Sequence, residues 1–479
     1  MTLTPTAPAP EACVLALSDI VGAAHVRTGP DTAKWSRDWT GLYQWQPRCV
    51  VLPASTAEVS AVVTYCHDND IPMVPAGGMT GLTGATQAEA AVMIGLDRMR
   101  SVRAIKPDAQ IILVDAGVII DTINEVAMEH GLVFPLSFGA RGSAMIGGAL
   151  STNAGGSNVL RYGSARALCL GVEVVLPDGR VMDLMSELRK DNSGLDLKHL
   201  FIGGEGTLGL ITGAVLKLSS EPAVRATAMI GMDRLAPALG LLNRLQEATG
   251  GAIEAFEYMP RTYIAKHVDK CGGREPFDDA HPVNILVEAA STRADDARAD
   301  ADGTPALLAT LQGVLADAFE AGDISDATVA QNEGQRTEMW TRREDAAEIT
   351  FDRHPLIDND IALPLEQVPA FLDAVAPRIR ALDPGSEDFI IAHLGDGNLH
   401  YTVYPTRSDA ELKDAVKEAI EEVVRDFGGS FSAEHGVGTA KLNSMTRRKD
   451  AVALDVMRSV KAALDPKGLM NPGKVFPNA

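Results

Sequence analysis

Apolar and polar positions follow two different rhythms over the first half of the chain. Short β-rich runs such as VVLPAS, QIILVDAGV, GVEVVLPDGR and LITGAVLKL are separated by TAEVSAVVTYCHD and DTINEVAMEHG, whose apolar residues recur at helical spacing. Alternation with a period of two is typical of strands, and a period near 3.6 is typical of amphipathic helices. The pattern predicts an α+β domain, rich in glycine turns, between Val50 and about Leu218.

The pattern changes after the segment SSEPAVR, where longer helical segments begin. In ELKDAVKEAIEEVVRDFGG one face of the expected helix carries five apolar residues: Leu412, Val416, Ile420, Val423 and Phe427. We therefore place a domain boundary near residue 222, so that the first domain covers 1–222. A second α+β domain with an antiparallel sheet is expected over 223–465, followed by a C-terminal tail over 466–479. The Ala/Asp-rich stretch 294–303 is expected to be an exposed loop or helix margin.

Length and charge exclude several classes of protein. A chain of 479 residues has room for two or three domains with substantial cores. Its formal charge of −21 would repel a polyphosphate backbone, so nucleic acid is not an expected partner. No uninterrupted apolar stretch reaches the ~20 residues needed to cross a bilayer, which argues against an integral membrane segment.

The N-terminal segment and the cysteines indicate the compartment. No basic residue precedes Arg27, whereas a secretory signal begins with positive charge. The five cysteines are odd in number and widely spread, without a C-x-x-C pair, which fits reduced thiols. We expect a cytoplasmic protein.

Two glycine-rich stretches stand out, PAGGMTGLTG at 75–84 and GGALSTNAGG at 147–156. Glycines let successive backbone N–H groups turn toward one concave surface, and such nests bind phosphate. A single Gly-Gly pair is more often a plain tight turn, and that alternative stays open for each stretch taken alone. Two such loops in one domain predict a large phosphate-bearing ligand.

A third glycine run, GEGTLG at 204–209, formally fits the dinucleotide fingerprint G-x-G-x-x-G. That fingerprint needs a helix opening on its last glycine. Here LITGAVLKL follows, and its pattern is that of a strand. The run therefore gives no support to a Rossmann fold or to a nicotinamide cofactor.

Chemistry-bearing residues gather in the segment Phe389–Val403. Two β-rich runs flank Asp396-Gly397, a strong hairpin signal. With this pair as a two-residue turn, His393 lies opposite His400. Opposed Cβ atoms in a ladder are about 4.5–5.5 Å apart, so the two rings can converge on one ion.

A third metal ligand is available in SAEHGVGT, where Glu434 lies beside His435. Two histidines and one glutamate with an open position fit a catalytic Zn²⁺, or Mn²⁺. A metal-dependent hydrolase that uses the glycine loops only as turns remains an alternative.

The glycine motifs, together with YGSARALCLGVEVVLPDG, resemble the FAD domain of the vanillyl-alcohol oxidase/p-cresol methylhydroxylase flavoprotein superfamily. HLGDGNLH and AEHGVG make the chain most similar, within it, to the FAD-dependent D-2-hydroxy-acid dehydrogenases. That group includes D-lactate, D-2-hydroxyglutarate and glycolate enzymes. The resemblance covers about Cys49 to Phe476. It implies a two-subdomain FAD-binding domain, a substrate- and metal-binding domain, and a tail that returns to the FAD domain. A flavin-binding protein without catalysis remains an alternative.

The resemblance implies a role for each of several residues. His393, His400 and Glu434 become metal ligands, and His435 becomes the general base that also contacts substrate. No histidine lies between His67 and His130, which implies non-covalent FAD. The residues expected around FAD come from the glycine runs, their flanks and the tail: Pro75, Ala76, Gly77, Gly78, Thr80, Gly81, Leu82, Ser143, Gly147, Gly148, Thr152, Asn153, Gly155, Gly156, Gly204, Glu205, Gly206, Thr207, Gly209, Ile211 and Asn471.

Two residues are expected to hold the substrate. The stretch Met339–Glu344 resembles the family's Trp-x-x-Arg-Glu segment and makes Arg343 the candidate partner of the substrate carboxylate, as a bidentate fork. The alternative is a surface arginine paired with Glu344 or Asp345. Asn398 is expected to hold either the hairpin or the substrate.

Three positions depart from the 2-hydroxyglutarate-type members, which carry a hydroxyl, a lysine and an asparagine there. This chain has Ala347, Asp358 and Thr402. Because an aspartate would repel a distal carboxylate, a smaller acid such as D-lactate, or a different polar 2-hydroxy acid, gains weight. The electron acceptor (a quinone, a cytochrome, an electron-transfer flavoprotein or oxygen) and a homodimer are left open.

Overall fold

The computed structural model describes residues 9–477 and divides into two compact units. The first unit holds the chain up to residue 154, 164–219 and the residues from 435 on. The second unit holds 155–163 and 220–434. The chain passes between them at residues 219–220, close to the boundary expected near 222. Residues 435–465, assigned to the second domain from the sequence, group with the first unit instead, because their contacts are made there.

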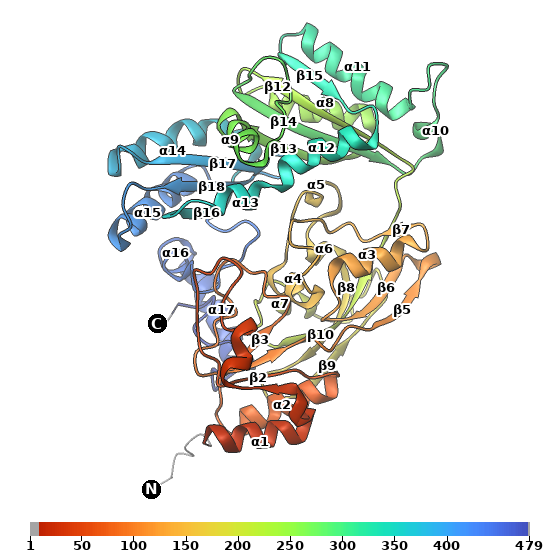
Figure 1. The fold of residues 1–479 in the computed structure, drawn as a ribbon. Coiled ribbons are helices and arrows are strands. Elements are labelled where there is room, and N and C mark those ends of the chain that lie inside the picture. Colours follow the sequence, from red (N-terminus) through yellow and green to blue (C-terminus); the bar gives the residue numbers. More distant parts are fainter. Residues whose placement is uncertain (1–8, 478–479) are drawn as a thin grey trace. The chain divides into compact units, whose positions relative to one another are not determined.

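The first unit contains two main sheets (Figure 1). In the four-stranded sheet, β1 (Val26–Arg27) is antiparallel to β2 (Cys49–Val51), which continues through β4 (Val92–Gly95) to β3 (Met73–Ala76) in parallel pairings. The five-stranded antiparallel sheet has the order β5-β6-β10-β8-β9. Its strands are β5 (Val102–Lys106), β6 (Ile111–Asp115), β10 (Leu210–Lys217), β8 (Cys169–Val175) and β9 (Val181–Leu184).

The remaining elements of this unit are short or helical. The helices are α1 (Pro10–Val21), α2 (Thr56–Asp68), α3 (Ile120–Met128), α4 (Ile146–Thr152), α6 (Ala165–Leu168), α7 (Lys198–Phe201), α16 (Leu442–Arg448) and α17 (Ala451–Leu464); two-residue strands are β7 (Leu132–Val133) and β11 (Ser219–Ser220). The helix α2 starts where the sequence favours it, because the Ser55 side chain caps it by accepting from the Glu58 N–H.

The expected alternation of strands and helices is confirmed, with one correction. The run 204–209 is followed by a strand, β10, as the non-Rossmann interpretation requires. The second glycine stretch was predicted to be a loop. This prediction is wrong for its first part, because residues 146–152 form the helix α4. Gly147 allows this helix to lie close to β6, since a Cβ there would be 2.7 Å from the Ala116 Cβ.

The second unit is built on a seven-stranded antiparallel sheet of order β15-β12-β14-β13-β17-β18-β16. This confirms the expected α+β domain with an antiparallel sheet. The strands are β15 (Asp326–Val329), β12 (Val224–Met232), β14 (Val283–Ser291), β13 (Ile253–Pro260), β17 (Glu387–His393), β18 (Asn398–Tyr404) and β16 (Ile357–Ala362); the helices are α5 (Val159–Tyr162), α8 (Ala238–Thr249), α9 (Arg261–Cys271), α10 (Ala294–Ala297), α11 (Ala306–Glu320), α12 (Glu333–Glu344), α13 (Ala346–Phe351), α14 (Val368–Leu382) and α15 (Ala410–Asp426).

The two faces of this sheet differ in what covers them. One face packs on α8, α11, α14 and α15 in an apolar core to which Tyr258, Leu399 and Tyr401 belong. The α15 residues Leu412, Val416, Ile420 and Val423 are buried there as expected, with Phe427 at the helix end partly buried. The other face lies under α9, α12 and α13 and buries Leu286, Phe389 and Ile391. Each large apolar side chain that is fully buried contributes about 1.5–3 kcal/mol to the free energy of folding.

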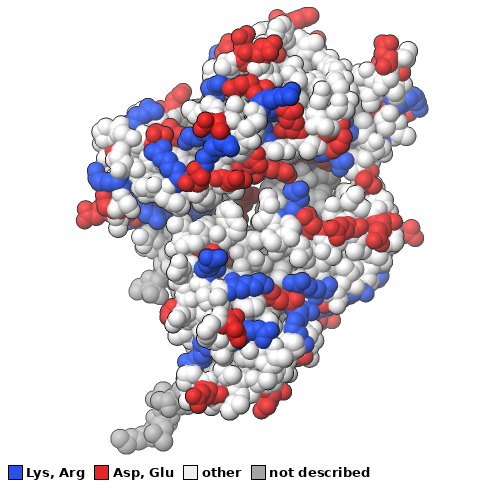
Figure 2. Space-filling model, in the orientation of Figure 1, with Lys and Arg blue, Asp and Glu red and all other residues white. Residues whose placement is uncertain are grey.

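The surface of the protein carries side chains of both charges. On the face drawn in Figure 2, acidic and basic side chains are interspersed over both units. None of the helices within residues 9–477 is long and apolar enough to traverse a bilayer. The short helix α10 has no buried residue, and residues 298–303 after it are exposed, as expected for this stretch.

Candidate functional site

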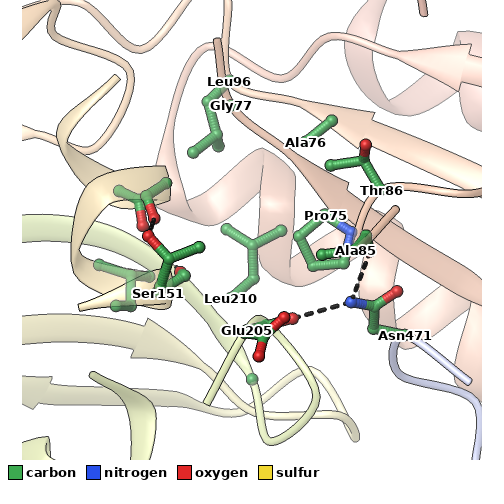
Figure 3. Close-up of a pocket in the computed structure, with 16 residues that line it drawn as sticks. Pro75, Ala76, Gly77, Ala85, Thr86, Leu96, Ser151, Glu205, Leu210 and Asn471 are labelled. Carbon is green, nitrogen blue, oxygen red and sulfur yellow. Dashed lines mark hydrogen bonds between the residues drawn. The ribbon is translucent and has the colours of Figure 1, made fainter. Parts of the chain in front are cut away.

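A cavity lies in the first unit beside β3, α4 and the start of β10 (Figure 3). It contains about 510 Å³ that protein atoms do not fill, including space open to solvent. Eleven of the residues expected around a cofactor line it: Pro75, Ala76, Gly77, Gly147, Gly148, Thr152, Glu205, Gly206, Gly209, Ile211 and Asn471. The three glycine runs, distant in sequence, therefore meet at one surface.

Other expected cofactor residues do not line this cavity: Gly78, Thr80, Gly81, Leu82, Ser143, Asn153, Gly155, Gly156, Gly204 and Thr207. Some of them hold the chain in place. Asn153 ends α4 in the left-handed conformation (φ 54°), and its side chain accepts from Ser164 Oγ and the Arg166 N–H, both at 2.9 Å. The Thr207 hydroxyl donates to the Gly204 carbonyl.

The sequence did not predict five of the residues that line the cavity: Ala85, Thr86, Leu96, Ser151 and Leu210. Four of them carry no motif, because small or apolar residues that line a cavity resemble core residues in sequence. Ser151 lies inside the second glycine run, and extending the site to the whole run would have found it.

Close packing explains the glycines of the first loop. A Cβ at Gly78 would lie 2.1 Å from the Ser143 carbonyl oxygen, and one at Gly77 would lie 3.6 Å from the Gly148 backbone. The loop therefore lies directly on the segment that leads into α4. A larger residue at Gly78 would force the two apart.

Asn471 supplies the cavity with a polar atom that has no protein partner. Its Nδ2 donates to the carbonyl oxygens of Ala85 (3.1 Å) and Glu205 (2.8 Å), as drawn in Figure 3. Its Oδ1 is buried and has no hydrogen-bond partner within residues 9–477. A buried acceptor without a partner costs free energy, so this atom fits a ligand that brings N–H or O–H donors, as FAD does.

Glu205 joins the third glycine run to the segment that follows His435. Its carboxylate accepts from the backbone N–H groups of Val437 (2.7 Å) and Gly438 (2.8 Å). Burial raises the pKa of Glu205, and these two hydrogen bonds oppose the rise. A Cβ at Gly436 would lie 2.8 Å from the Glu205 carboxylate, which explains the glycine there.

The histidine hairpin of the second unit forms, but its predicted register is wrong. His393 pairs with Asn398, and His400 pairs with Ile391. The connection is therefore a four-residue loop, 394–397, with Gly397 at φ 81°. Contacts outside the hairpin support this loop, because the Gly395 N–H donates to Phe256 in β13 and the Leu363 N–H donates to the Gly397 carbonyl.

The two imidazoles nevertheless meet, as diagonal neighbours on one face of the sheet. Their ring centroids are 5.4 Å apart. Glu434 Oε1 lies 3.7 Å from His393 Nε2 and 3.5 Å from His400 Nε2. Ligand atoms bound tetrahedrally at ~2.0–2.1 Å from a zinc ion are roughly 3.3–3.5 Å apart. Both histidines thus lie near Glu434 at about the separation that one ion requires. His393 is not part of the group of ligand atoms that all lie within 4.8 Å of one another, so it must move closer to His400 to share an ion with it.

Asp360 fixes this arrangement and was missed from the sequence. It is buried, accepts from the N–H groups of Ala433 (3.2 Å) and Glu434 (3.0 Å), and lies 3.9 Å from His400 Nδ1. Asp360, His400 and Glu434 each offer a ligand atom within 4.8 Å of the others. The strand also carries Asp358 and Asn359, so no signal in the sequence distinguishes Asp360 from its polar neighbours.

Asn398 serves the hairpin in the structure. It is buried, and its Nδ2 donates to Asp360 Oδ1 (2.9 Å) and to the Ile361 carbonyl (3.1 Å). These bonds join β18 to β16. Of its two expected roles, holding the hairpin is the one these contacts describe.

Arg343 is buried in the last turn of α12, which excludes the alternative of a surface arginine. Its Nε donates to Glu257 Oε2 at 2.6 Å, and its Nη2 lies 3.4 Å from both ring nitrogens of His393. The Glu257 carboxylate is 1% exposed and also lies 2.9 Å from His393 Nδ1. Glu257 was missed, because a single Glu in a strand carries no motif.

The charges of this group shift one another's pKa. Burial alone raises the pKa of Glu257, but His393 and Arg343 outweigh it and lower the pKa. Burial lowers the pKa of His393, but Glu257 outweighs it and raises the pKa to about 10. A metal ion bound to His393 Nε2 would replace the proton that the protonated imidazole carries on this nitrogen.

His435 follows Glu434 directly, and the division between the two units falls between these residues. Within the first unit, its carbonyl accepts from Thr83 Oγ1 at 3.4 Å. The backbone N–H groups of Val437 and Gly438, which follow it, donate to the Glu205 carboxylate. The backbone on the C-terminal side of the expected base is thus fixed by the first unit.

The family described as "FAD linked oxidases, C-terminal domain" matches residues 221–475, more than half of the chain, and the FAD binding domain matches residues 47–185. The chain belongs to the FAD-linked oxidases. The resemblance inferred from the glycine and histidine motifs is confirmed, and so is the expectation of an FAD-linked oxidoreductase.

Relatives of this FAD-linked oxidase align over nearly all of this chain. The D-2-hydroxyglutarate dehydrogenase of Xanthomonas citri is 32% identical over 97% of this chain and 96% of its own. That of Stutzerimonas stutzeri is 31% identical over 96% and 98%. A putative mitochondrial D-lactate dehydrogenase of Schizosaccharomyces pombe is 32% identical over 93% and 84%.

Solved structures show the same fold. p-Cresol methylhydroxylase with substrate bound aligns with a TM-score of 0.74 at 15% identity, over 98% of this chain and 97% of its own. Alkyldihydroxyacetonephosphate synthase aligns with a TM-score of 0.72 at 19% identity, over 99% and 88%. The expected vanillyl-alcohol oxidase type of fold is confirmed.

Proposed function

We propose that this FAD-linked oxidase oxidises a D-2-hydroxy acid to the 2-oxo acid with the help of a divalent metal ion. The observation that carries the proposal is the approach of His393 Nε2 and His400 Nε2 to Glu434 Oε1, at 3.7 and 3.5 Å, next to the buried Arg343. A metal ligand set beside a guanidinium suits a substrate that carries a hydroxyl next to a carboxylate. The names of the relatives support the same substrate class.

Each residue has a stated task in this proposal. When bound, the metal lowers the pKa of the substrate hydroxyl, and FAD accepts the hydride. His435 takes the hydroxyl proton as general base. Arg343 keeps its Nε on Glu257 and uses the remaining N–H groups of its fork to hold the substrate carboxylate.

The FAD site is proposed to include the cavity of the first unit. The glycine runs bring backbone N–H groups to its wall, and Asn471 Oδ1 offers an acceptor without a protein partner within residues 9–477. We propose that the flavin is held there without a covalent bond, and that the predicted cofactor residues outside the cavity act by supporting these loops.

Removal of the metal tests the metal dependence. The protein is dialysed against a chelator, and turnover of D-lactate and D-2-hydroxyglutarate is followed with an artificial electron acceptor before and after addition of Zn²⁺ or Mn²⁺. We expect activity to disappear and return while the bound FAD stays constant. Full activity in protein shown to hold no metal would contradict the proposal.

The substrate is proposed to lack a second carboxylate. Asp358 and Asp360 are alternate residues of β16 and lie on one face of the sheet, opposite Thr402 and His400 of β18. The Thr402 hydroxyl donates to Asp358 at 3.1 Å. A carboxylate two residues from Asp360, where the 2-hydroxyglutarate-type members have a lysine, would repel a distal carboxylate. A monocarboxylic acid such as D-lactate, or one with a neutral polar end, fits better.

An exchange at this position tests the substrate preference. We expect wild-type kcat/KM to be higher for D-lactate than for D-2-hydroxyglutarate, and Asp358→Lys to move the ratio toward the dicarboxylic acid. Asp358→Asn is the control that removes the charge without adding a new one. A wild-type preference for D-2-hydroxyglutarate would refute this part of the proposal.

Residence in the cytoplasm remains a prediction from the sequence. The electron acceptor (a quinone, a cytochrome, an electron-transfer flavoprotein or oxygen) and a homodimer are left open. Relatives in cattle and Arabidopsis are named as mitochondrial.

A further inference from the structure

We infer that Glu257 is a positioning residue that holds the metal ligand His393 and the substrate-binding Arg343 in one fixed relation. This inference rests on the proposed function. Glu257 lies on β13, His393 on β17 and Arg343 on α12, so three separate elements meet at this single carboxylate. The structure thus connects the two halves of the proposed substrate site.

Arg343 and His393 both lie within hydrogen-bonding distance of the Glu257 carboxylate. Arg343 Nε lies 2.6 Å from Oε2, and His393 Nδ1 lies 2.9 Å from the carboxylate. Both partners are buried, Glu257 is 1% exposed, and the carboxylate balances the guanidinium charge. Removing one partner of a buried ion pair leaves the other charge without compensation, so this group is held as a unit.

The bond to Nδ1 decides which nitrogen of His393 can bind a metal. A carboxylate only accepts hydrogen bonds, so His393 must carry its proton on Nδ1. The lone pair is then on Nε2, the nitrogen that faces Glu434 at 3.7 Å. A carboxylate behind a ligating imidazole fixes its tautomer and orientation in this way.

The substitution Glu257→Gln breaks this logic with almost no change in size. Its amide oxygen can accept from Arg343, but its NH₂ group then faces His393 Nδ1 and favours the proton on Nε2, where it blocks the metal. In the reverse orientation the NH₂ group faces the Arg343 Nε–H, and two donors oppose each other. Either orientation disturbs one half of the site.

A matched control lies on the neighbouring strand. Glu288 of β14 is 3% exposed and pairs with Arg336 of the same helix, α12, at 2.6 Å, two helical turns before Arg343. It also accepts from the indole N–H of Trp340 and the hydroxyl of Thr227. Glu288→Gln therefore disturbs a buried carboxylate that pairs with a half-buried arginine of the same helix, without contacting a histidine.

The experiment compares the two variants in the FAD-loaded protein. Zn²⁺ affinity is measured on chelator-treated protein by competition with a chromophoric chelator, and KM and kcat are measured with the best D-2-hydroxy acid at saturating Zn²⁺. We expect Glu257→Gln to weaken Zn²⁺ binding by roughly 10–100-fold and to raise KM even at saturating Zn²⁺. Glu288→Gln should leave both unchanged, and the flavin content should stay the same in both variants.

The outcomes separate this inference from the proposed function. If wild type binds Zn²⁺ and oxidises the acid but the two variants behave alike, Glu257 has only a structural role and the inference fails alone. A wild-type protein that binds no divalent ion overturns the proposed metal site together with the inference.

A second measurement reads the tautomer of His393 in the wild-type protein, and a variant serves only to assign the signal. In Zn²⁺-loaded wild type with ¹⁵N-labelled histidines, the His393 signal, identified by its absence from the His393→Gln spectrum, should show a protonated Nδ1 and a metal-bound Nε2. A metal-bound Nδ1 would overturn the inference.

Discussion

The cavity of the first unit and the hairpin site of the second unit are built from opposite materials. Around the cavity, glycines bring backbone atoms close together, and Asn471 Oδ1 is the polar side-chain atom left without a partner within residues 9–477. In the second unit, ionisable side chains meet on one face of a seven-stranded sheet and are bound to one another. A long ligand with many acceptor oxygens suits the first, and a small ion with a small acid suits the second.

The difference predicts which substitutions act locally and which act by displacing the chain. In the second unit a single side chain carries the chemistry, so its removal abolishes one function and spares the fold. In the first unit the backbone carries the binding, so harm comes from adding atoms.

The largest effect is expected for a metal ligand. His393→Ala removes one of the three proposed ligand atoms, so metal occupancy and turnover should both fall by more than about 10²-fold, with the FAD content unchanged. Metal analysis and steady-state rates measure this. His281→Ala, which removes another buried histidine of the same unit, is the control. Retention of a full complement of metal would contradict the ligand assignment.

The next effect is expected for the proposed base. His435→Ala should retain yellow FAD and bound metal, while the rate of flavin reduction by substrate falls by roughly 10²–10⁴-fold. Stopped-flow absorbance measures this step in isolation. An unchanged rate of reduction would remove His435 from the mechanism.

A smaller effect is expected from a methyl group in the first loop. A Cβ at Gly78 would lie 2.1 Å from the Ser143 carbonyl oxygen, so the loop must move in Gly78→Ala. Overpacking of this kind costs about 1–3 kcal/mol; because FAD must return the loop to its native position, this cost weakens FAD binding by roughly 5- to 150-fold. Gly139→Ala is the control, because no atom lies within 4 Å of its added Cβ. Equal flavin content in both variants would refute this account of the loop.

The smallest effect concerns a buried charge in the first unit. The Lys474 ammonium bonds to the carbonyls of Gln87 and Pro472, and burial lowers its pKa to about 8. Arg343, by contrast, is paired with a carboxylate. Because the folded pKa lies below the unfolded one, the folded state binds fewer protons between pH 8 and about 10.4, so stability rises with pH across that window.

Denaturant unfolding of wild type and Lys474→Met measures this difference. Wild type should gain up to about 1.4 kcal/mol per pH unit relative to the variant between pH 8 and about 10. Parallel pH profiles for the two proteins would show that Lys474 keeps its ordinary pKa.

From the sequence, the fold and the types of side chain at the candidate site could be predicted, but not how these side chains are arranged in space. The two histidines and Glu434 were identified because few residue types bind metals. Their cross-strand register was wrong, because Asp396-Gly397 favours a two-residue turn in isolation, whereas contacts of the loop with β13 and the segment after β16 support four residues. Glu257 and Asp360 were missed, because a buried carboxylate shows its role only through its partners in space.

The account is tested most directly by the flavin itself. The visible spectrum of the purified, metal-loaded protein is recorded without oxygen during addition of D-lactate, D-2-hydroxyglutarate, glycolate and D-malate in turn, with the L-forms of the chiral acids and a chelator-treated sample as controls. We predict that a D-acid bleaches the flavin band, that its L-form does not, and that the chelator-treated sample stays yellow until Zn²⁺ or Mn²⁺ is returned. A flavin band that no 2-hydroxy acid bleaches, or that bleaches equally without metal, would contradict the account.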